Sequence, residues 1–411
     1  MTTGTPRDAG RVVIIGAGLA GYSAAEQLRS LGHEGDIVIV DGEPAPYDRP
    51  PLSKELFAPD FSLDKLAFAS AQKLAEKRIQ TKFGSGAAAI DPAALAVTLH
   101  DGEVIAADTI LIATGGRART LPIPGADLPG VHVLRTFADA SALRARVTHG
   151  CRVVIIGAGL IGAELASSAL AVGADVTLID PVDVPLTPAV GELLATHLHG
   201  MHAERGIDVR VGVASAIEPV PDGLEVVLDD GTRCAADLVV VGIGIIPNVE
   251  LAESAGIEVD GGLLVSADYR TSAPDVFAAG DVIRLRGEDG ALLRREEHWE
   301  AAQLSGQHAA YGMLGLEPPS RGAPWFWTDR HGIHLEAVGR LSGPGDVVVR
   351  EGGDHPAVFL LDEGLLAGAA AIDDAMTVRA ARRLIDQRIP VSRGELSDPS
   401  VPLRSLLKAR R

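Results

Sequence analysis

The sequence has 411 residues, of which 46% are hydrophobic, and a formal net charge of −18. This length allows two or three domains, and the negative charge disfavours nucleic acid and anionic membranes as partners. The first ten residues are polar, and no segment approaches the roughly 18 consecutive apolar residues of a membrane span. We therefore expect a soluble, cytoplasmic protein that binds neither nucleic acid nor a membrane.

Residues 11–28 (RVVIIGAGLAGYSAAEQL) predict a strand, a tight turn and a helix. Gly16 permits the turn, Gly18 lets a pyrophosphate approach the backbone, and Gly21 allows the helix to pack closely on the strand. The unpaired N–H groups at the start of the helix favour a phosphate there. Asp41 ends the next apolar strand, where a carboxylate accepts from a ribose hydroxyl. The stretch therefore predicts a dinucleotide site.

The segment 43–57 (EPAPYDRPPLSKELF) follows this strand and is rich in proline. Its prolines fix an extended backbone, and Ser53 is predicted to cap a short helix. The segment also contains Arg49 and Lys54, two cations inside a nucleotide-binding fold. We interpret it as a loop that covers a ligand.

Residues 152–170 repeat the opening stretch, with glycines at Gly157, Gly159 and Gly162, and Asp180 ends the following strand. Each copy continues into a hairpin with an Asp-Gly turn and then into another apolar strand. The predicted cofactor-binding residues include those that follow this last strand in each copy, namely Thr114, Gly115 and Gly244. The repeat predicts two α/β dinucleotide folds in tandem, the first interrupted by the second.

The rest of the chain predicts a short strand that ends at Gly280-Asp281 and a helix over 297–314. From His334 onward, alternating apolar residues indicate an antiparallel sheet. Residues 375–388 then predict a helix with Arg379, Arg382 and Arg383 on one face. From Phe326 onward there are as many Lys and Arg as Asp and Glu, so the excess negative charge lies before that point.

Four motifs together, PYDRPPLSK, GAGLIGAE, AAGD and PWFW, resemble those of the flavin-dependent reductases that reduce the ferredoxins of bacterial oxygenases. The resemblance covers nearly the whole chain and implies a glutathione-reductase-like fold. It implies an FAD-binding domain over 1–115 and 248–325, an NADH-binding domain over 116–247, and a C-terminal α+β domain over 326–411. The implied enzyme takes a hydride from NADH onto FAD. It then passes electrons singly to a [2Fe–2S] ferredoxin that supplies a cytochrome P450 or a Rieske oxygenase.

The resemblance also implies which residues hold FAD. Either Asp41 or Glu43 binds the ribose, and Arg49 lies near the phosphates or the adenine. Asp281 accepts from the ribityl chain. The helix that begins near Glu297, His298 and Trp299 directs its N–H groups at the pyrimidine edge of the flavin.

Three further residues are implied to act in catalysis. In this family the lysine of RPPLSK, here Lys54, lies beside flavin N5 and pairs with the glutamate of GAGLIGAE, here Glu164. A buried lysine needs such a partner. We expect Lys54 to tune the flavin, Glu164 to help orient the nicotinamide, and Trp327 to lie at the flavin edge.

The choice of nicotinamide follows from charge. Asp180 is placed to accept from the 2′-hydroxyl of NADH and to repel the 2′-phosphate of NADPH. Residues 176–204 contain no Lys or Arg that would bind such a phosphate. The sequence departs from the family at Val184, near the place of a usual arginine, which affects the expected affinity for NADH.

The sequence indicates how electrons leave. Cys151 and Cys234 form no CxxC pair, which disfavours a disulfide reductase and leaves the acceptor to approach the flavin directly. The residues expected to meet an acidic ferredoxin are Arg294, Arg295, Arg330, Arg379, Arg382 and Arg383. A rubredoxin reductase, an NADH oxidase or a redox-sensing protein like apoptosis-inducing factor is the alternative.

No metal site is predicted. His197, His199 and His202 lie close together in sequence, but on a helix residues two apart point in different directions.

Overall fold

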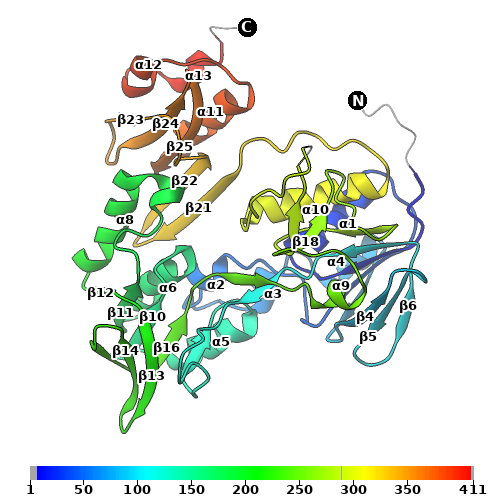
Figure 1. Ribbon diagram of the computed structural model, residues 1–411, viewed down its shortest axis with the longest axis horizontal. Helices are drawn as coiled ribbons and strands as arrows, with labels where there is room; N and C mark the ends of the chain where they lie inside the picture. The colour runs from blue at the N-terminus through cyan, green and yellow to red at the C-terminus, as the bar shows by residue number, and fades with distance from the viewer. Residues whose placement is uncertain (1–6, 288, 409–411) are drawn as a thin grey trace. The chain divides into compact units, whose positions relative to one another are not determined.

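The chain contains two five-stranded parallel sheets with matching strand orders (Figure 1). The computed structural model describes residues 7–287 and 289–408. Its packing divides the chain into two units. The first unit comprises the chain up to Arg49, Asp60–Arg117 and Ile245–Arg321, and the second comprises Pro50–Pro59, Ala118–Gly244 and the chain from Gly322 onward. This division by packing differs from the three functional domains given above, which stay a prediction.

The sheet of the first unit has the order β3-β2-β1-β7-β19. Its strands are β1 (Val12–Ile15), β2 (Ile37–Asp41), β3 (Ile79–Phe83), β7 (Thr109–Ile112) and β19 (Val276–Ala278). Strands β1, β2, β7 and β19 are short, apolar and buried on both faces, as parallel strands covered by helices are, whereas only Ile79 is buried in the edge strand β3. The hairpin strands β4 (Ala87–Asp91), β5 (Ala96–Leu99) and β6 (Val104–Ala106) form a separate antiparallel sheet.

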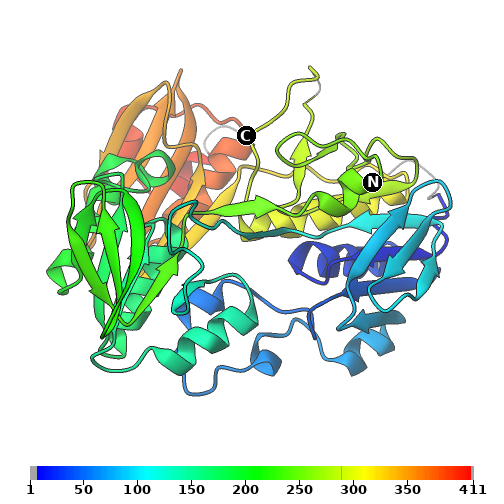
Figure 2. The same ribbon diagram turned by 60° about the horizontal axis from the view of Figure 1, so that its bottom comes forward.

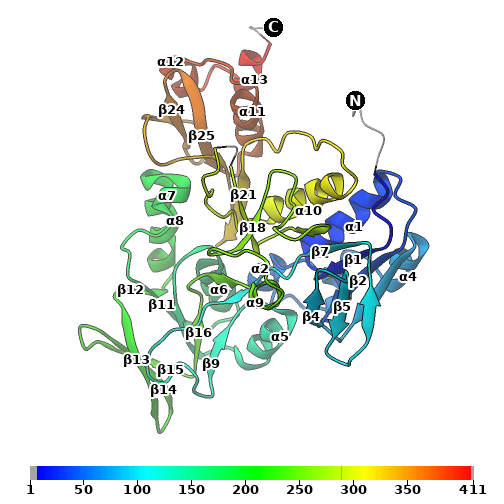
Figure 3. The same ribbon diagram turned by 45° about the vertical axis from the view of Figure 1, so that its right-hand side comes forward.

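Helices α1 (Leu19–Ser30) and α10 (Trp299–Met313) lie side by side in the first unit (Figure 3). They approach closely because Gly306 of α10 has no side chain. A Cβ at this position would lie 2.1 Å from the carbonyl oxygen of Ala20. The remaining elements of the unit are α3 (Leu63–Leu66), α4 (Ala71–Glu76), β8 (Gly116–Ala118), β17 (Ile245–Pro247), α9 (Glu250–Ser254), β18 (Leu263–Val265) and β20 (Ile283–Leu285).

The sheet of the second unit repeats the order as β12-β11-β10-β16-β9. Its strands are β9 (Val131–Val133), β10 (Arg152–Ile156), β11 (Asp175–Asp180), β12 (Asp208–Val211) and β16 (Leu238–Val241). The helices are α2 (Pro51–Lys54), α5 (Phe137–Arg146), α6 (Leu160–Ala171), α7 (Thr187–Val190) and α8 (Glu192–Glu204), and a meander contains β13 (Ala214–Val220), β14 (Gly223–Leu228) and β15 (Arg233–Ala236). The tandem α/β folds expected from the sequence are therefore confirmed.

The C-terminal part of the second unit is an antiparallel sheet of order β21-β22-β25-β24-β23, drawn in orange in Figure 2. Its elements are β21 (Trp325–Arg330), β22 (Ile333–Gly339), β23 (Asp346–Arg350), β24 (Ala357–Asp362), β25 (Leu365–Ile372), α11 (Ala375–Asp386), α12 (Arg393–Ser397) and α13 (Leu403–Leu406). Apolar side chains of α8, such as Leu194 and Leu198, share a core with Leu335 and Leu360 of this sheet. The antiparallel sheet and the helix after it are confirmed.

One local prediction is wrong. Ser53 does not cap a helix, because α2 begins at Pro51 with Pro50 at its N-cap, and Ser53 lies within it. Within residues 7–287 and 289–408, no helix is both long and apolar enough to cross a bilayer.

Gly306 and Gly200 offer a matched test of the helix packing. Alanine normally stabilises a helix by about 0.5–1 kcal/mol relative to glycine. We expect this gain for Gly200→Ala in α8, where a Cβ meets nothing within 4 Å. Gly306→Ala should instead lower the free energy of unfolding by roughly 1–3 kcal/mol, since its Cβ meets backbone. Urea unfolding of both variants measures the difference, and a stabilised Gly306→Ala protein would contradict this account of the packing.

Candidate functional site

The first glycine loop joins β1 to α1. Gly16 has a φ of +109°, and a Cβ there would lie 2.2 Å from the carbonyl oxygen of Ala113. A Cβ on Gly21 would lie 2.0 Å from the carbonyl oxygen of Gly16. The packing of the protein itself therefore requires both glycines. Gly18 differs, because a Cβ at this position would meet nothing within 4 Å.

The second glycine loop repeats this pattern. Gly157 has a φ of +106°, and a Cβ there would lie 2.4 Å from the carbonyl oxygen of Gly242. A Cβ on Gly162 would lie 1.9 Å from the carbonyl oxygen of Gly157. A Cβ on the middle glycine, Gly159, again meets nothing within 4 Å. Gly159 and Gly18 are also the N-caps of 12-residue helices. Both loops thus present bare backbone and helical N–H groups to open space, which fits a pyrophosphate.

Asp41 and Asp180 close the two loops in the same way. Oδ2 of Asp41 accepts from the N–H of Ala17 at 2.6 Å, and Oδ2 of Asp180 accepts from Ala158 at 2.7 Å. Each aspartate thus fixes the residue that follows the first glycine of its loop. Burial raises the pKa of the Asp41 carboxyl, although the N–H groups that it accepts from favour the ionised form.

Glu43 and Arg49 form an ion pair in the first unit, with Arg49 Nη2 2.9 Å from Glu43 Oε1. The Tyr47 hydroxyl donates to the other carboxylate oxygen. Both partners of the ion pair are partly exposed. The carboxylate is therefore held in one orientation at the end of β2.

The start of α10 lies in the same unit as the first glycine loop. His298 is the N-cap of α10, and the indole N–H of Trp299 donates to Asp48 at 2.8 Å. The N–H of Gly280 donates to Ser305 Oγ of α10 at 2.9 Å, which places the end of β19, and Asp281 after it, beside this helix. Burial lowers the pKa of His298, so its ring is neutral near pH 7.

The residues after the last strand of each copy lie in loops that hydrogen bonds hold in place. Thr114 and Asn248 exchange hydrogen bonds of 2.9 Å, hydroxyl to carbonyl and amide to carbonyl. Gly115, with a φ of +61°, accepts from the N–H of Asn248 at 3.0 Å. Gly244 has a φ of +96°, and its carbonyl accepts from the N–H of Arg119.

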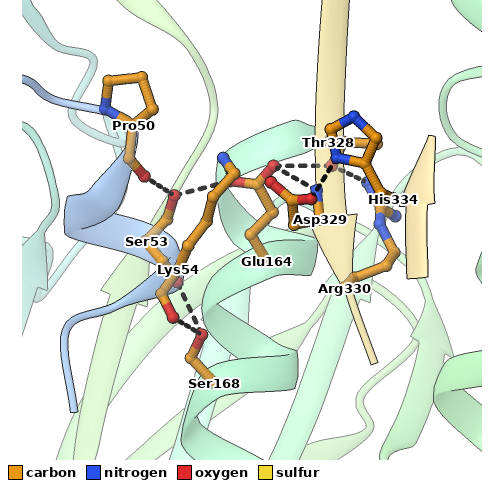
Figure 4. Close-up of polar contacts among 9 residues, drawn as sticks. All are labelled: Pro50, Ser53, Lys54, Glu164, Ser168, Thr328, Asp329, Arg330 and His334. Atoms are coloured by element: carbon orange, nitrogen blue, oxygen red, sulfur yellow. Dashed lines mark hydrogen bonds and ion pairs between the residues drawn. The ribbon is translucent and has the colours of Figure 1, made fainter. Parts of the chain in front are cut away.

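The carboxylate of Glu164 lies at the centre of a buried network in the second unit (Figure 4). Oε2 accepts from the Ser53 hydroxyl at 2.6 Å and from Lys54 Nζ at 2.7 Å. Oε1 accepts from the Thr328 hydroxyl at 2.7 Å and from the N–H of Asp329 at 3.4 Å. An ionised carboxylate accepts about four hydrogen bonds, so its acceptor positions are filled by protein. The side chain is 3% exposed, and these donors replace water.

Arg330 adds a second cation to this network. Its Nη2 donates to the Thr328 hydroxyl at 3.0 Å, and its Nε has no partner among the described residues. Burial lowers its pKa to about 10, against the opposing charge of Glu164. Arg330 is 3% exposed, so its assignment to a docking surface is wrong. Sequence reasoning missed Ser53, Thr328 and Arg330 as members of the network, because the network's hydrogen bonds to Glu164 join segments that are far apart in sequence.

The two tryptophans of PWFW stack on β21. The ring centroids of Trp325 and Trp327 are 5.1 Å apart with an interplanar angle of 27°. Lys54 Nζ lies 5.8 Å from the centroid of the Trp327 ring. The indole N–H of Trp325 donates to Glu336 at 2.7 Å, which fixes the stack. Trp327 is thus an aromatic, partly exposed neighbour of the lysine.

The histidines of α8 differ in burial, and His197 is exposed while His199 is partly buried. His202 is fully buried, and its Nδ1 lies 2.8 Å from His331 Nε2. Burial is the main cause that lowers the pKa of His202 to about 3 and that of His331 to about 4. Among the described residues, no group of three or more His, Cys, Asp or Glu side chains is arranged to hold a metal ion.

Both cysteines are unpaired, Cys234 buried and Cys151 partly so. Burial raises the pKa of each thiol. Neither is therefore activated as a thiolate.

Of the remaining predicted docking residues, Arg294, Arg379 and Arg383 are exposed, Arg382 is partly exposed, and Arg295 pairs with Glu297.

The chain matches two family models. One, described as pyridine nucleotide-disulphide oxidoreductase, matches residues 10–306, and the other, described as reductase C-terminal, matches residues 325–407. Rhodocoxin reductase of Rhodococcus erythropolis is 35% identical over 398 residues, which cover 96% of this chain and 93% of the relative. The ferredoxin–NAD(+) reductase component of the anthranilate 1,2-dioxygenase system of Burkholderia cepacia is 36% identical and covers 96% and 98%. The crystal structure of the covalent putidaredoxin reductase–putidaredoxin complex matches with a TM-score of 0.91 and 32% identity, over 98% and 99% of the two chains.

His202 makes stability depend on pH. Because its pKa is about 3 when folded and about 6.5 when unfolded, the unfolded chain binds the extra proton between these values. The stability that neutral His202 contributes is therefore fully present above pH 6.5. As the pH falls from 6.5 toward 3, the free energy of unfolding decreases by up to about 1.4 kcal/mol per pH unit. We expect His202→Gln to flatten the dependence of unfolding free energy on pH between 6.5 and 4.5. The exposed His149→Gln is the control, and equal slopes in the two variants would contradict the assignment.

Proposed function

The chain belongs to the pyridine nucleotide-disulphide oxidoreductase family, and from this premise we propose that it is an FAD-dependent NADH:ferredoxin reductase. The observation behind this proposal is the pair of glycine loops. In each loop a Cβ on the middle glycine would meet no protein atom within 4 Å, so a bound ligand is the reason for a glycine there. The two cysteines are unpaired and form no dithiol. The relatives named as ferredoxin–NAD(+) reductase components support it over nearly the full length. The electrons are destined for a [2Fe–2S] ferredoxin that supplies a cytochrome P450 or a Rieske oxygenase.

The first unit holds FAD. The loop of Gly16 and Gly18 would receive the pyrophosphate, and Glu43 with Arg49 would meet the adenosine end. We propose that the N-terminus of α10 and Asp281 contact the flavin end. When bound, FAD supplies a ring that accepts a hydride from NADH and releases two electrons one at a time.

The second unit binds NADH. The loop of Gly157 and Gly159 would receive its pyrophosphate, and Asp180 lies at the end of the adjacent strand. Residues 176–204 contain no Lys or Arg to bind a 2′-phosphate, and Asp180 would repel it.

Lys54 is the residue of the buried network that we propose to act on the flavin. Its ammonium pairs with Glu164, and the Lys54 side chain is 16% exposed. Since the acceptor positions of Glu164 are already filled, we propose that Glu164 positions Lys54 and does not orient the nicotinamide by itself. Trp327 stacks beside them and would limit water near the lysine.

The chain has no pair of cysteines that could relay electrons from the flavin to the acceptor. We propose that an acidic ferredoxin docks through exposed arginines, of which Arg379 and Arg383 lie one turn apart on α11. Arginine and carboxylate charges steer such an encounter and raise its rate at low salt. We place the reaction in the cytoplasm, where NADH is available and two unpaired cysteines stay reduced.

An anaerobic stopped-flow experiment tests the function. NADH should bleach the bound flavin rapidly and NADPH much more slowly. An added plant-type [2Fe–2S] ferredoxin should then restore the flavin absorbance as it is reduced. Persistent reduced flavin that reoxidises only with rubredoxin or oxygen would favour a rubredoxin reductase or an NADH oxidase. A long-lived reduced complex that dimerises with NADH would favour a redox-sensing protein.

Glu164→Ala tests the buried pair. Without the carboxylate, Lys54 loses its partner and its fixed position, so the rate of flavin reduction by NADH should fall by about tenfold or more. The FAD content should change little, because the first unit holds that cofactor. The exposed Glu192→Ala in the same unit should leave the rate unchanged. An unaltered rate in Glu164→Ala would remove Glu164 from the mechanism.

Charge reversal on α11 tests the docking surface. The double variant Arg379→Glu/Arg383→Glu should lower kcat/KM for ferredoxin by at least about tenfold at low salt. High salt should shrink the difference, because it screens exposed charges. Arg146→Glu, an exposed change elsewhere in the second unit, is the control. Flavin reduction by NADH should be the same in all three proteins, and an unchanged kcat/KM in the double variant would move the docking site away from α11.

A further inference from the structure

The two dinucleotide folds carry different side chains at the second position after the loop-closing aspartate, Glu43 in the first fold and Val182 in the second. We propose that this position sets how tightly each fold holds its nucleotide, and that Val182 leaves the adenosine ribose of NADH without the carboxylate that Glu43 offers to FAD. The inference rests on the proposed function and names a specificity-determining residue for it.

The equivalence of Glu43 and Val182 follows from hydrogen bonds. Oδ1 of Asp41 accepts from the N–H of Glu43 at 2.9 Å, and Oδ1 of Asp180 accepts from the N–H of Val182 at 2.9 Å. The second oxygen of each aspartate closes its glycine loop, at 2.6 Å and 2.7 Å. The two turns therefore match bond for bond, although Gly42 stands between the pair in the first fold and Pro181 in the second. Glu43 and Val182 occupy the same place.

Glu43 is prepared to accept a hydrogen bond. Arg49 Nη2 lies 2.9 Å from one of its oxygens, and the Tyr47 hydroxyl donates to the other. Each oxygen keeps a second lone pair, and the side chain is 27% exposed. A fixed, partly open carboxylate beyond the end of this strand suits the hydroxyls of an adenosine ribose. The first fold thus offers two carboxylates, Asp41 and Glu43.

Val182 offers no acceptor from its side chain, although it is 55% exposed. On the neighbouring strand, Val211 pairs with Asp180 and is 54% exposed. These valines can contact an adenine ring through apolar surface alone. At the position of Glu43 the second fold therefore offers no carboxylate, and Asp180 and the exposed Asp183 are the acidic residues on either side of Val182.

The difference between Glu43 and Val182 fits the different roles of the two nucleotides. FAD remains bound through many turnovers, whereas NAD+ must leave after each hydride transfer. A hydrogen bond from a hydroxyl to a carboxylate changes affinity by about tenfold or more. The loss of one such bond at Val182 speeds release of the oxidised nucleotide without changing the loop that receives its pyrophosphate.

Calorimetric titration of the flavin-loaded protein with NAD+ tests this inference. Val182→Glu should lower the Kd for NAD+ by about tenfold. The gain should vanish with an NAD+ analogue whose adenosine carries a 2′,3′-dideoxyribose, since the introduced carboxylate then has no hydroxyl to accept from. Val182→Ala is the matched control and should show no gain with either nucleotide.

Two outcomes would overturn the inference. One is a Kd that is unchanged in Val182→Glu or that falls equally for both nucleotides. The other is a Kd for NAD+ that rises about tenfold in Asp183→Asn. Asp183 would then already supply the carboxylate that the inference says is missing from the second fold. Failure of the proposed function is distinct: it appears in the unmodified protein as bound flavin that NADH does not reduce, whatever Val182→Glu does to the Kd.

Discussion

The second unit depends on one buried carboxylate. Glu164 lies on α6, and its four donors come from α2 and β21, which are separated from it by more than 100 residues in either direction. A buried charge without partners is costly, so α2 and β21 must both reach α6 before the network is stable. The charge of Glu164 therefore fixes the position of Lys54 and couples it to the strand that carries Trp327.

The network contains charges of both signs. Lys54 and Arg330 carry two positive charges, while Glu164 and Asp329 supply two carboxylates, and Arg330 donates to the Thr328 hydroxyl. Burial shifts the pKa of Arg330 down to about 10, which leaves the guanidinium charged near neutral pH. Hydrogen bonds from Lys54 and from the hydroxyls of Ser53 and Thr328 hold α2 and β21 on the carboxylate of α6.

Much of the fold was predictable because its signals are local. The glycines of each loop, the β-branched runs before them and the Asp-Gly turns lie within a few residues of the structures that they determine. Ser53 and Arg330 show where this fails. Ser53 resembles a cap and Arg330 a surface cation in sequence, yet Ser53 donates to Glu164 of α6 and Arg330 is buried beside Thr328. A pattern along the chain does not contain these tertiary contacts. The membership of Thr328 in the network is non-local in the same way.

The internal repeat also shows what a sequence pattern can hide. Asp41 and Asp180 both stand where an acid is expected to bind ribose, and in the structure each first serves to close its own loop. Because both folds share this hydrogen bond from the glycine loop to the aspartate, the difference between a retained cofactor and an exchanging substrate has to arise from the neighbouring residues. The sequence presents those residues as an irregular stretch, EPAPYDR after one strand and VDVPLTP after the other. Only the matching turns align them, and the alignment places an anchored carboxylate in one fold opposite an exposed valine in the other.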